Sequence, residues 1–88
     1  WFHLCGLLIV GCLICGTASS QPLVVALGDS NTAGYGVGQG NAFPAQLSTM
    51  LQRRGYNARI ANAGISGDTF GGMLNRLDTS VPAGTRLV

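Results

Sequence analysis

The segment from Leu23 to Ser30 constrains the fold of this chain more than any other. It reads Leu-Val-Val-Ala-Leu-Gly-Asp-Ser, a continuous apolar run that stops abruptly at a glycine. A continuous rather than alternating apolar run is typical of a strand buried on both faces of a sheet. We therefore expect a buried strand over Leu23–Leu27 that delivers the Ser30 hydroxyl to the rim of a sheet. There, Ser30 is a candidate nucleophile.

Alternating helical and strand patterns follow this run. We expect a glycine-rich loop over 28–41, a helix over 42–54 and a weaker strand over 58–63. A second loop over 64–69 and a short helix over 70–77 come next. After a turn at 82–84, a third strand opens at 86–88. This order predicts an α/β fold with a parallel sheet. Right-handed crossovers would bring both loops to the carboxyl edge of the sheet, where open α/β sheets bind ligands.

Apolar residues recur at helical spacing in both expected helices and would face the sheet. They are Phe43, Leu47, Met50 and Leu51 in the first helix and Met73, Leu74 and Leu77 in the second. Pro44 is tolerated in the first turn of a helix, and Asp68 or Thr69 would cap the second helix.

Charged residues are few, and all of them lie after residue 20. Five arginines oppose three aspartates, and a net charge of +2 from scattered arginines is too small for a nucleic-acid footprint. We therefore expect no nucleic-acid partner. A parallel α/β domain normally needs about 100 residues to cover both sheet faces. We expect residues 21–88 to be the N-terminal part of a larger domain, and the first residue, Trp1, points the same way.

Residues 1–20 have the composition of a secretory signal peptide with a truncated start. The apolar run from Leu4 to Cys15 is shorter than the roughly 18 to 20 residues that span a bilayer, and it fits a signal h-region. Small residues follow, so cleavage is expected after Ala18 or Ser20, which would leave a secreted or periplasmic protein without a membrane span. Two alternatives stay open. Cys12 would be lipidated if the lipobox-like sequence before it is read, or the segment would be an uncleaved anchor.

A serine nucleophile needs a base, a group that orients the base, and donors for the developing oxyanion. The backbone amides of Ser30 and of Gly67 in the second loop would supply two donors, since Gly67 has no Cβ to block close approach. The G-x-S-x-G elbow of α/β-hydrolases is not matched, because Thr32 stands where the second glycine would be. Gly-Asp-Ser alone also fits a plain strand-ending turn in which Ser30 caps a helix.

Two longer blocks resemble the GDSL (SGNH) hydrolase family. Leu27–Gly36, Leu-Gly-Asp-Ser-Asn-Thr-Ala-Gly-Tyr-Gly, looks like the first block of the family, and Phe43–Leu47 looks like the start of its first helix. Asn62–Thr69, Asn-Ala-Gly-Ile-Ser-Gly-Asp-Thr, looks like the second block. The chain is most similar to the bacterial arylesterase, thioesterase I and lysophospholipase L1 group. The resemblance implies a flavodoxin-like three-layer fold and hydrolysis of esters or thioesters through an acyl-serine.

The resemblance also implies roles for single residues. Ser30 matches the nucleophile and one oxyanion donor, Gly67 matches the second-block oxyanion donor, and Asp29 matches an aspartate that supports the loop. We expect Asp68 to be a loop or cap residue and Ser66 to be a turn residue. The implied partner is a small ester, thioester or lysophospholipid substrate, with no cofactor and no metal.

Other positions of the family have no counterpart in this chain. The third block of the family supplies an Asn donor, and its last block supplies an Asp and a His as orienter and base. The only histidine here, His3, precedes the fold and would leave with the signal peptide. We therefore expect the 88-residue polypeptide to be inactive and the complete gene product to be a hydrolase.

Two other classes of protein stay open. A strand followed by a glycine-rich loop also suggests a nucleotide- or phosphate-binding α/β module, although G-x-G-x-x-G is not met and the chain has no lysine for a Walker motif. A non-catalytic, truncated secreted protein is the other class, and its exposed sheet edge would favour aggregation. Neither substrate preference nor oligomeric state is indicated by the sequence.

Overall fold

The computed structural model describes residues 21–88, so the expected signal peptide, Cys12 and His3 lie outside the described residues. Within this part the chain forms a parallel sheet of three strands in the order β2-β1-β3. The strands are β1 (Leu23–Gly28), β2 (Arg59–Gly64) and β3 (Thr85–Leu87). The predicted α/β fold with a parallel sheet is confirmed.

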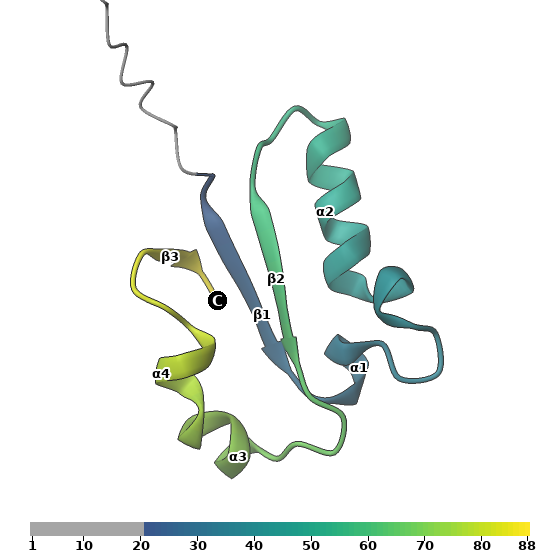
Figure 1. Ribbon diagram of the computed structural model, residues 1–88. Coiled ribbons are helices and arrows are strands. Elements are labelled where there is room, and N and C mark those ends of the chain that lie inside the picture. Colours follow the sequence, from purple (N-terminus) through teal and green to yellow (C-terminus); the bar gives the residue numbers. More distant parts are fainter. Residues whose placement is uncertain (1–20) are drawn as a thin grey trace, which may run out of the picture.

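Helices fill the two connections between the strands (Figure 1). The first connection holds α1 (Ser30–Ala33), the 3-10 helix η1 (Gln39–Asn41) and α2 (Phe43–Arg53), and the second holds α3 (Phe70–Asn75) and α4 (Leu77–Ser80). Because β2 and β3 flank β1 on opposite sides, right-handed crossovers require the two connections to cover opposite faces. In Figure 1, α2 lies on the β2 side and α3 and α4 lie on the β3 side. Flavodoxin-like doubly wound sheets begin with this strand order.

The loop expected over 28–41 contains two short helices that the sequence pattern did not predict. Asp29 caps α1 by accepting a hydrogen bond from the Asn31 N–H over 3.2 Å, so Ser30 is the first helical residue and not the cap. The helix expected over 70–77 ends at Asn75, and α4 continues to Ser80. Thr69, one of the two expected caps, accepts from the Gly72 N–H over 3.0 Å. Such caps start short helices without any apolar periodicity.

The predicted inward faces of the helices are largely wrong. Five of the apolar residues expected to face the sheet are exposed, namely Phe43, Leu47, Met50, Leu74 and Leu77. Pro44 is buried instead, and Ala45 and Ser48 line a hollow between α2 and β2. The side of α2 that faces β2 therefore carries small side chains, and most of its larger apolar side chains are exposed within residues 21–88.

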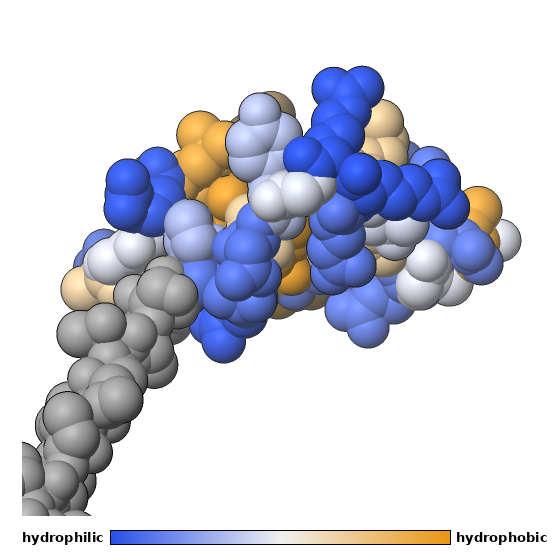
Figure 2. Space-filling model, turned by 90° about the horizontal axis from the view of Figure 1, so that it is seen from above, coloured by the Kyte–Doolittle hydropathy of each residue, from blue (hydrophilic) through white to orange (hydrophobic). Residues whose placement is uncertain are grey.

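The buried apolar side chains within residues 21–88 are those of Val25, Ala42 and Pro44. Val25, in the middle of β1, is 1% exposed, whereas the flanking residues Val24 and Ala26 are only partly buried. The expected burial of β1 on both faces therefore holds at its centre alone. Figure 2 shows an end of the molecule on which hydrophilic side chains predominate and apolar ones are visible between them.

Candidate active site

The carboxyl ends of β1 and β2 lie side by side. Gly28 and Gly64, the last residues of these strands, pair in the parallel register, and the Ile65 N–H donates to the Gly28 carbonyl over 3.1 Å. The loops that carry Ser30 and Gly67 begin at these two positions. The sheet therefore brings both loops to one edge, as the alternation of strands and helices predicts.

Ser30 occupies the first position of α1 and is partly buried. Gly34 ends the helix in the left-handed conformation, with a φ of 90°, and its N–H donates to the Ser30 carbonyl over 3.0 Å. The sharp return of the chain after one helical turn keeps Ser30 at the rim of the sheet. Its hydroxyl makes no hydrogen bond to any other group of residues 21–88.

Gly67 lies in a tight turn that spans Ile65–Asp68. The Asp68 N–H donates to the Ile65 carbonyl over 3.1 Å, and Gly67 has a φ of 84°, which identifies a type II turn with glycine at its third position. A Cβ on Gly67 would meet no atom within 4 Å, so the backbone conformation and not the available space requires glycine. The Gly67 N–H has no acceptor within the described part of the chain.

α1 rests directly on the ends of β1 and β2. A Cβ on Gly64 would overlap the Ala33 backbone nitrogen and lie 2.7 Å from the Thr32 carbonyl carbon. Asn62 adds a polar connection, because its Nδ2 donates to the Thr32 carbonyl over 2.8 Å and its Oδ1 accepts from the Gly64 N–H over 2.9 Å. Gly64 and the side-chain amide of Asn62, both on β2, therefore fix the position of α1, the helix that carries Ser30.

Asp68 forms an ion pair with Arg76, in which Arg76 Nε donates to Asp68 Oδ2 over 2.7 Å. Asp68 Oδ1 also accepts from the Thr69 N–H over 2.9 Å. The hydrogen bond from Arg76 lowers the pKa of Asp68 below its ordinary value, against an opposing effect of desolvation. Asp68 is thus an ionised loop residue, and the expectation of a loop role for it agrees with the structure.

The sequence patterns give neither Arg76 nor Asn62 a role of its own. Arg76 stands eight residues after Asp68, on the far side of α3, and no local pattern connects the two. Asn62 interrupts an apolar strand, and an isolated polar residue within a buried strand is the signal that would have singled it out.

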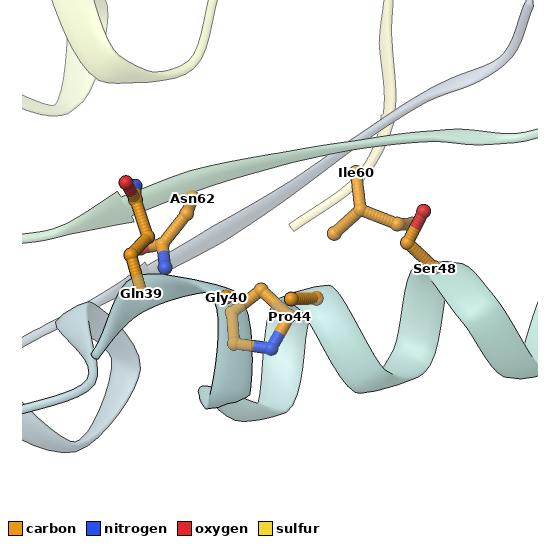
Figure 3. Close-up of a pocket in the computed structure, with 7 residues that line it drawn as sticks. Gln39, Gly40, Pro44, Ser48, Ile60 and Asn62 are labelled. Carbon is orange, nitrogen blue, oxygen red and sulfur yellow. The ribbon is translucent and has the colours of Figure 1, made fainter. Parts of the chain in front are cut away.

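A hollow of about 400 Å³ lies between η1, α2 and β2 (Figure 3). Its lining includes Gln39, Pro44, Ser48 and Ile60, and neither Ser30 nor Gly67 contributes to it. Pro44, Ala45 and Ser48 are the α2 residues that line it. It is therefore distinct from the candidate active site.

The fold and the site define a doubly wound α/β protein with a serine at the first position of the helix that follows the central strand. The chain belongs to the GDSL-like lipase/acylhydrolase family, which matches residues 26–88, as the two sequence blocks predict. The esterase TesA of Pseudomonas aeruginosa is 41% identical over 75 residues, covering 81% of this chain and 37% of that protein. An arylesterase of Vibrio mimicus is 38% identical over 75 residues, covering 85% of this chain and 37% of that protein.

Solved structures give the same family. The crystal structure of AlinE4, an esterase of the SGNH-hydrolase family, superimposes with a TM-score of 0.64 at 44% identity. The match covers 72% of this chain and 33% of AlinE4. The chain thus spans about a third of the length of the relatives that it matches.

Proposed function

We propose that the protein expressed from the full-length gene hydrolyses carboxylic esters or thioesters through an acyl-serine on Ser30. The observation that carries the proposal is the position of Ser30 at the carboxyl end of the central strand, with a hydroxyl that no described residue engages. The N–H of Gly67, in the adjacent loop, also has no acceptor among residues 21–88. The family and the esterases among its relatives support the reaction class.

The reaction proceeds in two steps. Ser30 Oγ attacks the acyl carbonyl carbon while a base removes its proton, and the oxyanion binds to the N–H groups of Ser30 and Gly67. The leaving alcohol or thiol takes the proton, and water then hydrolyses the acyl-serine with the same base. Residues 21–88 contain no histidine, so the base comes from outside them. Asp29 supports the Ser30 turn through its cap on α1.

Labelling with a fluorophosphonate probe tests this proposal. In the full-length protein we expect the probe on Ser30, and Ser30→Ala to abolish labelling and lower kcat for p-nitrophenyl butyrate by at least about 10³-fold. Ser48→Ala, on α2, is the matched control and should retain both. Covalent probe on Ser66 instead of Ser30, or undiminished turnover by Ser30→Ala, would refute the assignment. Parallel assays with palmitoyl-CoA and lysophosphatidylcholine distinguish the esterase, thioesterase and lysophospholipase types.

We also propose that the 88-residue polypeptide by itself is inactive. Without a base, a serine hydroxyl is a weak nucleophile at neutral pH, and the single histidine of the chain, His3, precedes the sheet in sequence. The isolated polypeptide should show no p-nitrophenyl butyrate hydrolysis above that of its Ser30→Ala variant. A Ser30-dependent rate would contradict this.

We propose further that the protein is exported, with cleavage after Ala18 or Ser20. The support is the short apolar run of residues 4–15 and the small residues after it. Within residues 21–88, every helix is too short or too polar to be a membrane span. N-terminal sequencing of the protein from the cell exterior or periplasm tests the cleavage site. Metabolic incorporation of labelled palmitate that depends on Cys12 would show lipidation instead.

A further inference from the structure

Arg76 joins three segments around the candidate active site. Its Nε donates to Asp68 Oδ2 over 2.7 Å, its Nη2 donates to the Gly28 carbonyl over 3.0 Å, and its Nη1 donates to Ser80 Oγ over 3.0 Å. The Arg76 side chain is only 18% exposed and that of Asp68 only 12% exposed. All three nitrogens of this planar, partly buried guanidinium group therefore donate hydrogen bonds.

Two of these contacts are made by residues within two positions of the proposed oxyanion donors. Asp68 directly follows Gly67, and Gly28 lies two residues before Ser30. The Gly28 carbonyl also accepts from the Ile65 N–H over 3.1 Å, at the start of the Gly67 turn. The Ile65 N–H thus connects the beginning of the Gly67 turn to the Gly28 carbonyl of β1. Arg76 connects the end of the turn, at Asp68, to the same Gly28 carbonyl. The guanidinium thus fixes one loop relative to the other.

We propose that Arg76 is a positioning residue of the acyl-transfer site. It holds the Gly67 turn against the end of β1 so that the N–H groups of Gly67 and Ser30 converge on one oxyanion. The inference rests on the proposed function. Oxyanion donors act at about 2.7–3.1 Å from the developing charge, and a displacement of about 1 Å costs on the order of 10²-fold in rate.

Lysine cannot replace arginine in this role. A lysine ammonium is a point charge on a flexible stem, whereas the guanidinium places its donors in a fixed plane toward Asp68 Oδ2, the Gly28 carbonyl and Ser80 Oγ. Arg76→Lys keeps the positive charge and loses the simultaneous contacts. The substitution therefore separates positioning from charge.

Steady-state kinetics of the full-length protein test the inference. For p-nitrophenyl butyrate we expect Arg76→Lys to lower kcat by about 10- to 100-fold with KM changed by less than about 2-fold, since the oxyanion forms only in the transition state. The rate constant for labelling of Ser30 by a fluorophosphonate should fall in parallel. Asp68→Asn should give a similar loss, and the double variant should lose little more than either alone, because the two side chains act as one unit.

Arg54→Lys, at the exposed end of α2, is the matched control and should leave kcat and KM unchanged. Far-UV circular dichroism shows whether each variant folds. If Arg76→Lys does not fold, the kcat and KM of Asp68→Asn test the inference in its place. A folded Arg76→Lys or Asp68→Asn variant with wild-type kcat overturns the inference while the proposed function stands. A wild-type protein that takes no probe on Ser30 overturns the proposed function, and the inference falls with it.

Discussion

At the scale of the residue, Gly67 is required for its backbone conformation. Its φ of 84° falls in the left-handed region, where a Cβ costs roughly 1–2 kcal/mol, although no atom lies within 4 Å of that Cβ. We expect Gly67→Ala to relax the type II turn, move the N–H and lower kcat by about 10- to 100-fold with little change in KM. Kinetics and thermal unfolding of the full-length protein check this.

Gly71→Ala is the matched control for that substitution. Gly71 lies within α3 without a positive φ, and the nearest atom to its Cβ position is Thr69 Oγ1 at 3.9 Å. Alanine should raise helix stability by up to about 1 kcal/mol and leave kcat unchanged. Equal kcat values for the Gly67 and Gly71 variants and the wild type would contradict a role of the Gly67 conformation in catalysis.

The ion pair between Asp68 and Arg76 predicts a specific acid sensitivity. The Arg76 hydrogen bond lowers the folded-state pKa of Asp68. A lowered carboxyl pKa stabilises the folded state fully above its unfolded pKa of about 3.9, and the contribution is lost as the pH falls through the lowered pKa. The difference in Tm between the wild type and Asp68→Asn should therefore be largest above about pH 4 and should shrink toward pH 2.

Asp78→Asn serves as the control, since Asp78 is an exposed residue of α4. Thermal unfolding of the full-length protein from pH 7 to pH 2 makes the measurement. The ion pair would have no part in stability if the Asp68→Asn difference were the same at both ends of that range.

At the scale of the element, the packing of α1 depends on the absence of a side chain at Gly64. A Cβ on Gly64 would overlap the Ala33 nitrogen, and backbone atoms cannot move aside as a flexible side chain would. We expect Gly64→Ala to cost about 1–3 kcal/mol of stability and to displace α1, which slows probe labelling of Ser30. Gly40→Ala is the matched control, because a Cβ there meets nothing within 4 Å and its φ is not positive. Unchanged stability and labelling of Gly64→Ala would show that α1 is not seated as described.

Elements differ in how far the sequence predicts them. The strand at Leu23–Leu27 and the second loop are predicted because a continuous apolar run and a glycine cluster are local signals. α1 is missed because a side-chain cap from Asp29, and not apolar periodicity, starts it. The break between α3 and α4 carries no side-chain cap and no break in the apolar spacing that would mark it in the sequence. The inward faces of α2 and α3 are misassigned because helical periodicity identifies an apolar face but not the element that covers it, and Phe43, Met50 and Leu74 remain exposed within residues 21–88. Arg76 is missed because its partners are distant in sequence.

At the scale of the whole molecule, the strand order places Ser30 where doubly wound sheets bind ligands. Among the described strands β1 is central, with β2 and β3 on its two sides, and in doubly wound sheets ligands bind outside the carboxyl end of the strand where the order reverses. β3 pairs with Leu23 and Val24, at the opposite end of β1 from Ser30. Of the described elements, the loops after β1 and β2 therefore form this edge, and the position of Ser30 follows from topology as much as from its motif.

Burial decides whether residues 21–88 are stable as a separate polypeptide. Their buried apolar side chains are Val25, Ala42 and Pro44, while Phe70, Leu74 and Leu87 are 91%, 70% and 62% exposed. Each large apolar side chain contributes about 1.5–3 kcal/mol only when it is fully buried. Ordering the chain costs about 1–2 kcal/mol per residue in backbone entropy, which so little burial does not offset. We expect the isolated polypeptide to lack a cooperative unfolding transition.

Thermal scans of residues 21–88 make that measurement. Far-UV circular dichroism should change gradually with temperature, and tyrosine fluorescence of Tyr35 and Tyr56 should not follow the same curve, because two-state unfolding requires coincident transitions. The full-length protein is the comparison. We expect both probes to report one sharp transition for it, because burial of the apolar side chains that are exposed in residues 21–88 would make unfolding cooperative. Coincident, sigmoidal transitions of the isolated polypeptide would mean that the β2-β1-β3 sheet and its helices fold cooperatively on their own.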